Sequence, residues 1–374
     1  MIVYPAEYTA HKEAVFTALA AVSGGARRLG VIPLSFRDHP ETTARVMDAQ
    51  ARAKRPGASA LGRWIKRLLL RGQYNWSRHY FATHPRHIAV AWNGLGGSRQ
   101  LFLQAARDAG AATLHAELAP FPGRITLDPV GVNAEGSVPQ DPAFYRDWAM
   151  THPTTDWRAI GASLTARRSR RGDVGQGMGD IPDTPFLFCP LQVPNDSQVT
   201  LFAGWCGGMA GFLAALHRAA AHLPPGWHLR LKEHPSAKVP LGPLIAPLVA
   251  AGRVILDNAN DSFAQIAASR GVVTLNSSMG LQAFFREKPV MTLGRAFWAI
   301  PGLATSAPDQ TTLDRAFAAP DALTFDPDFR AAFILWLGQV YYPRFTHAPL
   351  SFDHSAFAAK LQQAQALSPA HALR

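Results

Sequence analysis

The sequence contains only two cysteines in 374 residues, and this scarcity excludes a disulfide framework. Neither Cys189 nor Cys206 has a CxxC neighbour, so the cysteines do not indicate a zinc site either. Apolar runs of about 18 residues or more are also missing, which argues against a membrane-spanning helix. These features favour a reducing, cytoplasmic location.

Several catalytic and nucleotide-binding motifs are absent as well. The sequence has no GxxxxGK[ST] loop, no HExxH motif and no GxSxG motif. Residues 93–99 begin like a GxGxxG fingerprint, but Arg99 occupies the third glycine position, which disfavours a dinucleotide site. The acidic run 257–261 lacks a histidine or a third carboxylate at metal-ligand spacing, so we expect neither a metal nor a cofactor.

Acidic residues are outnumbered by basic ones, 26 against 37, which gives a formal net charge of +11. Such a charge favours anionic partners. Residues 52–86 contain no Asp or Glu, and their Lys and Arg residues alternate with Trp, Tyr and Leu. Two interpretations are open: the segment lies on the anionic surface of an inner membrane, or its apolar side faces the core. It contains no recognisable nucleic-acid reader motif, so we expect no nucleic-acid partner.

Strand-like and helix-like patterns alternate along the chain, which predicts an α/β fold with parallel sheets. The predicted strands are 87–92, 112–117, 186–189, 227–232, 254–256, 271–275 and 289–293, and the main predicted helices are 14–22, 98–108, 208–222, 262–268, 279–286, 329–340 and 355–366. Composition shifts over 167–185, where Arg167, Arg168, Arg170 and Arg171 precede a Gly- and Pro-rich stretch. We therefore predict a first domain over 1–175, a second over 176–325, and C-terminal helices over 326–374 that pack back across both.

Polar clusters follow several predicted strands, and ligands of open α/β sheets bind at the carboxyl ends of strands. Lys232 and His234 suit a phosphate or carboxylate group. Residues 276–280 follow the next strand, and Ser277 or Ser278 can cap a helix whose backbone N–H groups hold a phosphate. Glu287 ends that helix, where an acid is unfavourable for the dipole, and ribose hydroxyls are a suitable ligand for it.

The loop 190–198 is a further polar cluster, and it contributes Gln192, Asp196 and Ser197. In the first half, Glu117 ends a strand, and Asp128 and Asn133 lie in the loop behind it. A carboxylate in this position can act as the base or as the nucleophile of a glycosyl transfer. The alternative is that these acids are structural caps.

Taken in order, these clusters resemble the bacterial capsule polysaccharide biosynthesis/export family. The resemblance covers about residues 92–294 and is carried by these motifs: Trp92-Asn93-Gly94, Glu117 to Pro122, Asp128 to Asn133, Pro190-Leu191-Gln192 with Asp196-Ser197-Gln198, Lys232-Glu233-His234-Pro235, and Asn276 to Gly280 with Lys288-Pro289-Val290.

The resemblance implies a GT-B-like fold, in which two Rossmann-type domains face each other across a cleft. It also implies a single-module β-Kdo transferase that moves Kdo from CMP-Kdo to a lipid-linked acceptor. Such an enzyme is expected to associate peripherally with the inner membrane and to belong to a capsule synthesis or export complex. The implied catalytic residues are Glu117, His234 and Asp128. The implied donor-binding residues are Gln192, Asp196, Ser197, Lys232, Asn276, Ser277, Ser278, Gly280 and Glu287, and the acceptor-side residues are Asn93, Gly94 and Asn133.

Two other functions are compatible with the same architecture. One is a different sugar-nucleotide enzyme, such as a UDP-sugar transferase or epimerase. The other is a non-catalytic capsule export factor that uses its basic face to dock on a membrane or a polymer.

Overall fold

The computed structural model describes residues 1–54, 57–154, 156–166, 169–238 and 241–369. Arg55, Arg167 and Arg168, which belong to the basic segments noted above, lie outside these ranges. The chain forms two compact units, one of residues 1–138 and 337–374 and the other of residues 139–336. Each unit is described by itself, and the cleft predicted between them stays a prediction.

Unit 1 is built on a five-stranded sheet in the order β2-β1-β3-β4-β5. Its strands are β1 (Ile2–Pro5), β2 (Ala26–Leu29), β3 (Ile88–Trp92), β4 (Thr113–Leu118) and β5 (Ile125–Asp128). The first four are parallel, and β5 pairs antiparallel with β4. All five residues of β3 are buried, as expected for a parallel strand covered on both faces.

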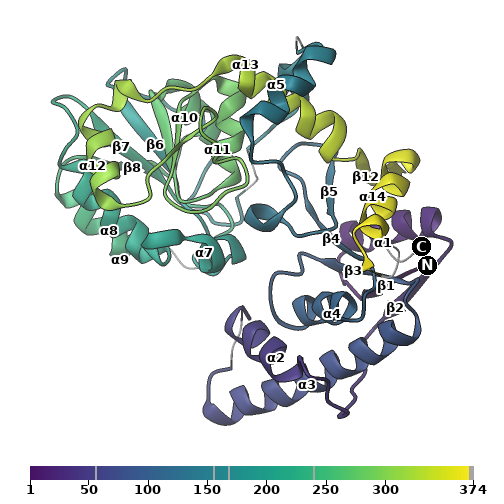
Figure 1. The fold of residues 1–374 in the computed structure, drawn as a ribbon. Helices are drawn as coiled ribbons and strands as arrows, with labels where there is room; N and C mark the ends of the chain where they lie inside the picture. The colour runs from purple at the N-terminus through teal and green to yellow at the C-terminus, as the bar shows by residue number, and fades with distance from the viewer. Residues whose placement is uncertain (55–56, 155, 167–168, 239–240, 370–374) are drawn as a thin grey trace. The chain divides into compact units, whose positions relative to one another are not determined.

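Helices cover both faces of this sheet (Figure 1). Unit 1 contains α1 (Ala10–Ser23), α2 (Thr42–Ala51), α3 (Ala60–Thr83), α4 (Gly97–Asp108) and α14 (His354–Ala366), with a small hairpin of β12 (Phe345–His347) and β13 (Leu350–Phe352). Phe16 of α1 and Phe357 of α14 pack on the face that carries Ile2 and Val90. On the other face, Val3 and its neighbours pack against α3 and α4.

Unit 2 is built on a six-stranded sheet in the order β11-β10-β9-β6-β7-β8, and all its strands are parallel. The strands are β6 (Phe186–Pro190), β7 (His228–Lys232), β8 (Val254–Leu256), β9 (Gly271–Thr274), β10 (Val290–Thr292) and β11 (Thr305–Ser306). The first strand lies in the middle, and later strands are added on one side and then on the other. This is the doubly wound order of a Rossmann-type fold.

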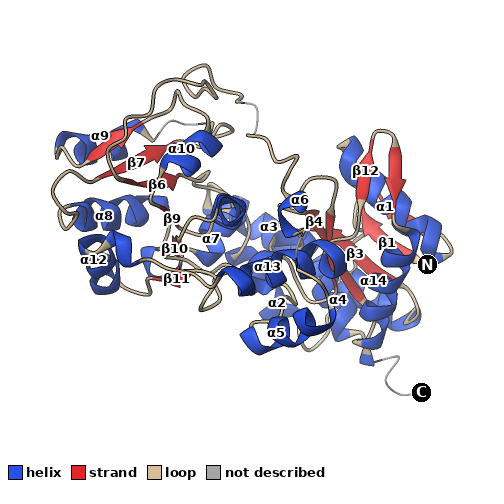
Figure 2. Cartoon of the chain, turned by 90° about the horizontal axis from the view of Figure 1, so that it is seen from above, coloured by secondary structure: helices blue, strands red, loops and turns tan. Residues whose placement is uncertain are grey.

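The helices of unit 2 lie on both sides of its sheet (Figure 2). They are α5 (Pro142–Thr151), α6 (Trp157–Ile160), α7 (Ser197–Phe202), α8 (Met209–Ala220), α9 (Gly242–Ala250), α10 (Ser262–Ala268), α11 (Ser278–Ala283), α12 (Gln310–Ala318) and α13 (Pro327–Trp336). Phe212 of α8, Leu248 of α9 and Phe317 of α12 pack together on the face that carries Leu187 and Leu229.

The two units, with their mainly parallel sheets, confirm the predicted α/β fold, but the predicted boundaries at 175 and 325 differ from those of the two compact units. Residues 139–175 belong to unit 2, where α5 packs on α13. The final segment does not form a separate layer, because α13 belongs to unit 2 and α14 to unit 1. The composition shift over 167–185 therefore marks a loop inside unit 2 and not a domain boundary.

Candidate functional site

In the sheet of unit 2, β7 and β8 lie on one side of β6, and β9, β10 and β11 lie on the other. The strand order therefore reverses between β6 and β9, and this place is called the switch point. Doubly wound folds bind ligands there, beyond the carboxyl ends of the strands. Gln192 follows β6 and Asn276 follows β9. The Gln192 Nε2 donates to Asn276 Oδ1 at 2.9 Å, and the Asn276 backbone N donates to Gln192 Oε1 at 3.2 Å. The two predicted site residues therefore meet at the switch point.

Both side chains are buried, however, and their amides serve the protein itself. The Asn276 Nδ2 donates to the carbonyl oxygens of Gln198 and Phe202 at 2.9 and 3.1 Å. Because the Gln192–Asn276 pair ties the two loops together, we assign it a positioning role. This differs from the direct donor contact that the sequence predicted.

The remaining polar residues of these two loops form helix starts. Asp196 caps α7 by accepting from Gln198 N at 2.9 Å, and Ser277 caps α11 by accepting from Met279 N at 3.2 Å. Ser197 and Ser278 are the first residues of the two helices, and Ser278 is exposed. The cap predicted at Ser277 or Ser278 is thus formed by Ser277, which leaves Ser278 as the more accessible hydroxyl.

Gly280 allows close packing beneath this loop. A Cβ atom at this position would lie 2.5 Å from the buried ring of Trp298. The glycine is therefore needed for the packing of α11. This packing role differs from the donor contact that the sequence predicted for Gly280.

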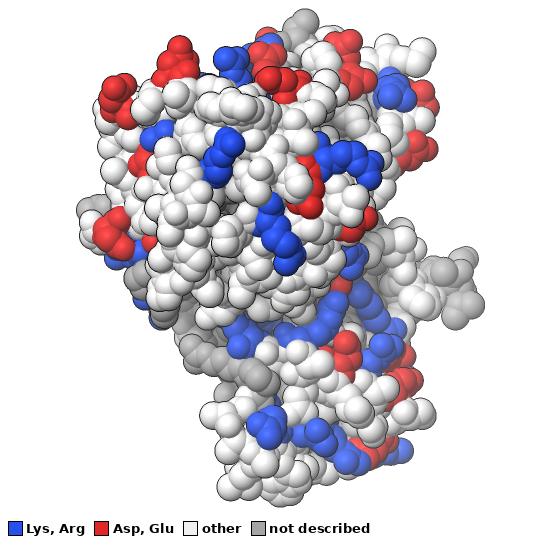
Figure 3. Space-filling model, turned by 90° about the vertical axis from the view of Figure 1, so that its left-hand side faces the viewer, with Lys and Arg blue, Asp and Glu red and all other residues white. Residues whose placement is uncertain are grey.

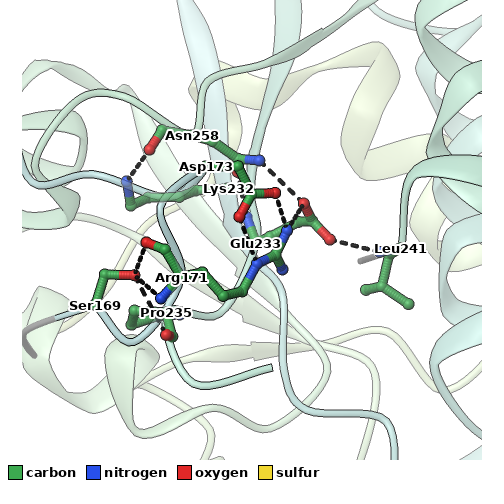
Figure 4. A network of polar contacts seen from close by, with 8 residues as sticks. All are labelled: Ser169, Arg171, Asp173, Lys232, Glu233, Pro235, Leu241 and Asn258. Carbon is green, nitrogen blue, oxygen red and sulfur yellow. Dashed lines mark hydrogen bonds and ion pairs between the residues drawn. The ribbon is translucent and has the colours of Figure 1, made fainter. Parts of the chain in front are cut away.

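Lys232, at the end of β7, is buried and ties the loop at Gly175 to the loop 258–260; Figure 4 shows its contact with Asn258. Its Nζ donates to the carbonyl oxygens of Gly175 at 2.8 Å, Asn258 at 3.0 Å and Asn260 at 2.6 Å. An ammonium group has three N–H donors, so these bonds use all of them. Burial lowers the pKa of Lys232. This structural role differs from the direct contact with a donor anion that the sequence predicted for Lys232.

Glu233 is buried beside it and receives three hydrogen bonds (Figure 4). The donors are Arg171 Nη2 at 3.0 Å, Asn258 Nδ2 at 3.0 Å and Leu241 N at 2.5 Å. Burial by itself raises the pKa of this carboxyl group, but the hydrogen bonds, that from Arg171 first, bring it below its ordinary value. Arg171 also pairs with Asp173, so this arginine of the predicted linker has a structural partner.

His234 is half-buried in the turn that follows. Its Nδ1 accepts a hydrogen bond from Ser236 N at 3.0 Å. A neutral imidazole that accepts at Nδ1 carries its proton on Nε2, so the ring presents a donor on its other side. Because Lys232 and Glu233 hold the turn rigid, His234 is the member of the Lys-Glu-His-Pro motif best suited to contact a ligand.

Glu287 has a left-handed backbone (φ 52°) and follows the short 3-10 turn Phe284–Arg286. Its carboxylate is exposed and forms an ion pair with Arg158. The next carbonyl, of Lys288, accepts from the buried Arg330 at 2.7 Å. Arg330 thus supports the turn that presents Glu287, and the carboxylate stays accessible for the predicted ribose contact.

In unit 1, the predicted residues Glu117 and Asn93 are brought together at the carboxyl ends of β4 and β3. The Asn93 Nδ2 donates to Glu117 Oε2 at 2.8 Å, and the backbone N of Leu118 donates to Glu117 Oε1 at 2.9 Å. Asn93 has a left-handed backbone with φ 61°. Glu117 is half-buried, so its carboxylate is oriented by neighbours but not enclosed.

Two residues that the sequence analysis did not single out support this pair from below. Arg107 Nη2 donates to Nε2 of the buried His115 at 2.9 Å, and His115 Nδ1 lies 2.9 Å from the Asn93 carbonyl oxygen. Because arginine can only donate, the His115 Nε2 is the acceptor and the proton lies on Nδ1. The Nδ1–H group therefore donates a hydrogen bond to the Asn93 carbonyl oxygen. Gly94, at φ 77°, lies against the same imidazole, where a Cβ would approach Nδ1 to 2.7 Å.

Asp128 is completely buried, and this placement differs from its predicted catalytic role. Its carboxylate accepts from the backbone N of Val130, Gly131 and Ser137, from the Ser137 hydroxyl, and from the Tyr341 hydroxyl at 2.6 Å. Asp128 therefore organises the loop 129–137. Asn133 lies in that loop with φ 56°, half-buried, and its predicted acceptor contact stays a prediction.

The switch point of unit 1, between β1 and β3, carries a charged cluster that the sequence analysis did not identify. Glu7, just after β1, is buried and pairs with Lys12 at 3.1 Å and with Arg99 at the start of α4. The available signal was a polar stretch directly after the residues Ile2–Pro5. The sequence did not predict the strand β1 before this cluster, because four residues are too few to show a clear periodicity of apolar side chains.

The buried His115 makes a testable contribution to stability. Burial, and next the charge of Arg107, lower its pKa from 6.5 to about 4. The unfolded chain therefore binds a proton more readily, and stability that is complete above pH 6.5 is lost as the pH falls towards 4. We expect a loss of about 3 kcal/mol from this group. Urea unfolding at several pH values should show a flatter profile for His115→Asn over this range. An unchanged profile would contradict the assignment.

The chain is similar to several known proteins, some of which are named for capsule polysaccharides. Residues 182–342 match the model of the family described as capsule polysaccharide biosynthesis protein. The protein FixF of Sinorhizobium fredii is 31% identical over 302 residues, which cover 78% of this chain and 70% of FixF. The capsule polysaccharide modification protein LipB of Neisseria meningitidis is 32% identical over 135 residues, or 34% of this chain and 31% of LipB.

A solved structure has the same fold over nearly the whole chain. It is the β-Kdo 2,7 transferase of Thermosulfurimonas dismutans KpsC, at 13% identity and a TM-score of 0.52, covering 97% of this chain and 98% of that one. This similarity agrees with the predicted GT-B-like fold, which contains two Rossmann-type domains. In the described part of the chain, no helix is long and apolar enough to cross a membrane. Nor do those residues contain a group of three or more His, Cys, Asp or Glu suited to a metal ion.

Proposed function

Because this chain belongs to the family of capsule polysaccharide biosynthesis proteins, we propose that it is a glycosyltransferase that transfers Kdo from CMP-Kdo to a lipid-linked acceptor. The observation that carries the proposal is the doubly wound sheet of unit 2, whose switch point is lined by the loops after β6, β7 and β9. A parallel sheet of this order binds nucleotides at that edge. The acidic sugar and phosphate of such a donor suit a chain with a net charge of +11.

The donor is proposed to bind at this edge of unit 2. His234 would donate through Nε2 to the phosphate, Ser278 would offer its exposed hydroxyl, and Glu287 would accept from ribose hydroxyls. When the bond between the sugar carbon and the phosphate oxygen breaks, CMP leaves with an additional negative charge on its phosphate. A hydrogen-bond donor of the protein that is held in place by the fold stabilises that charge without having to reorganise. This is an effective form of catalysis. Lys232 would act only indirectly, by fixing the turn.

The reacting carboxylate is proposed to be Glu117 of unit 1. It can take the proton of the acceptor hydroxyl as that oxygen attacks the sugar, or it can attack the sugar carbon first and be displaced by the acceptor. The hydrogen bonds from Asn93 and Leu118 favour the ionised form that both routes require. Hydrogen-bond donors of the protein are proposed to stabilise the charge of the leaving phosphate, and neither a metal nor a cofactor is proposed.

The lipid-linked acceptor places the proposed reaction at a membrane. We therefore propose a cytoplasmic protein that associates peripherally with the anionic inner membrane and works in a capsule synthesis or export complex. The basic segment 52–86 supports this location, since cations near an anionic leaflet each add about 1 kcal/mol of attraction.

A thermal-shift experiment tests the donor class. CMP at about one hundred times its Kd should stabilise the protein by about 2.7 kcal/mol and raise its Tm, because the ligand binds only the folded state. UDP at the same concentration should produce a smaller shift. A larger shift with UDP would indicate a UDP-sugar enzyme instead, and the absence of any shift with either nucleotide would favour a non-catalytic export factor.

A further inference from the structure

Helix α3 carries its apolar stripe on the side that faces solvent. Five large apolar residues of its first half, which we call the outer face, are between 36% and 65% exposed: Leu61, Trp64, Ile65, Leu68 and Leu69. Their spacing of i, i+3, i+4, i+7 and i+8 places them on one side of the helix. In most surface helices such a stripe packs on the core, but α3 contacts the core through other residues, including Leu70 and Tyr74.

Cations flank the outer face, and α3 itself contains no acidic residue. Arg63, Arg67 and Arg71 are exposed, and Lys66 is half-buried. The sequence contains no Asp or Glu between Asp48 and Asp108. In the lower part of Figure 3, Lys and Arg side chains lie next to uncharged surface, with a few Asp and Glu side chains at its edge. One of these cations is neutralised locally, because Arg71 pairs with Asp38.

A neighbouring loop extends the apolar surface. Leu34 and Phe36 are 44% and 72% exposed, and the backbone N of Ser35 donates to the Gly72 carbonyl at 3.0 Å. The side chain of Leu34 covers Gly72, where a Cβ would approach it to 3.0 Å. The loop is thus held against α3 one turn beyond Leu68. A contiguous apolar area of this kind on a folded chain marks a contact surface.

We propose that the outer face of α3 docks on an anionic lipid bilayer, with its apolar side chains in the interfacial region and Arg63, Lys66 and Arg67 at the headgroups. A helix with Trp and Leu on one side and cations along its flanks is suited to lie in the plane of a membrane. A helix that carries several cations and no acid is complementary in charge to an anionic lipid surface. The inference stands on the surface of α3 and extends the proposed function by naming how the enzyme reaches a lipid-linked acceptor.

Vesicle co-sedimentation of the full chain tests the proposal. The probe is vesicles of phosphatidylcholine with roughly one third phosphatidylglycerol, a composition that gives an anionic surface. We expect binding at low salt, at least tenfold weaker binding to pure phosphatidylcholine, and strong weakening at high salt. Arg63→Gln with Arg67→Gln should weaken binding about thirtyfold, from about 1 kcal/mol per cation. Leu61→Ser with Leu68→Ser should weaken it at least tenfold.

Matched controls use exposed residues of unit 2. Leu244→Ser on α9 and Arg315→Gln on α12 change the same residue types on surfaces outside α3 and should leave vesicle binding unchanged. Unchanged Tm values would show that the α3 variants fold. If those variants bound vesicles as well as the parent chain, or if the outer face instead mediated self-association in sedimentation velocity, the proposal would be overturned.

The experiment also separates this proposal from the proposed function. Stabilisation by CMP depends on unit 2 and should survive every α3 substitution. Vesicle binding without any nucleotide effect would support the docking surface and count against the transferase. The reverse pattern would retain the transferase and reject the docking surface.

Discussion

Replacing Glu117 with Gln is expected to reduce sugar transfer about a thousandfold, within the range for losing a positioned acid–base group. The amide keeps the shape of the side chain but can neither accept the acceptor proton nor attack the sugar carbon. Glu117 lies in unit 1, whereas the proposed nucleotide site lies in unit 2. The stabilisation by CMP should therefore be unchanged in thermal-shift measurements.

An Asn93 variant serves as the matched control for this substitution. Asn93→Ala removes the 2.8 Å hydrogen bond to Glu117 but keeps the carboxylate. We expect it to lower turnover less than Glu117→Gln does, because the carboxylate remains and loses only one of the groups that orient it. Full turnover in Glu117→Gln, or loss of CMP binding with turnover retained, would contradict the role assigned to Glu117.

Replacing His234 with Ala is expected to lower turnover about a hundredfold, or about 3 kcal/mol in transition-state stabilisation. The imidazole is positioned by Ser236 N so that Nε2 carries the donor proton, and alanine removes that donor. Because the turn is held by Lys232 and Glu233, the fold should be preserved. Steady-state kinetics with CMP-Kdo, together with urea unfolding, would measure both effects.

His217→Ala, on the exposed surface of α8, is the matched control and should change neither quantity. A His234→Ala variant that keeps full turnover would remove this residue from the mechanism. A variant that unfolds would instead show that His234 supports the turn, and His234→Asn, which retains a side-chain acceptor for Ser236 N, would then test the donor role separately.

The sequence predicted the strands β6 to β10 of the second unit, because most of them are apolar runs bounded by turn residues, but it did not predict the two-residue β11. β8 and α10 have the predicted bounds, and β7 differs by one residue. In contrast, β1 and β5 were not predicted. They have four residues each, and β5 lies in a stretch whose proline and glycine content is typical of a loop.

The sequence predicted where the candidate site residues lie better than it predicted what their side chains do. Gln192, Asn276 and Ser277 do lie in the loops at the switch point of unit 2, since residues that follow neighbouring parallel strands converge on one edge. The structure gives Lys232 and Asp128 structural roles that differ from the predicted ones, because sequence does not show burial. A lysine that donates to three carbonyls and an aspartate that accepts five hydrogen bonds are indistinguishable in sequence from exposed ligands.

The supporting network of unit 1 shows the same limit. Arg107 lies in the middle of a helix pattern and His115 in the middle of a strand pattern, and nothing in the sequence connects them. Only the folded chain places the guanidinium 2.9 Å from the imidazole and the imidazole beneath Asn93. Contacts of this kind depend on side-chain direction across a helix–sheet interface.

Mass spectrometry of the products formed from CMP-Kdo and a lipid acceptor, by the parent chain and by Glu117→Gln, tests the central claim most directly. The account predicts an acceptor heavier by one Kdo residue and an equal amount of CMP with the parent chain, and almost none of either product with the variant. An acceptor left unmodified by the parent chain, under conditions in which CMP raises its Tm, would contradict the claim that this nucleotide-binding chain is a Kdo transferase.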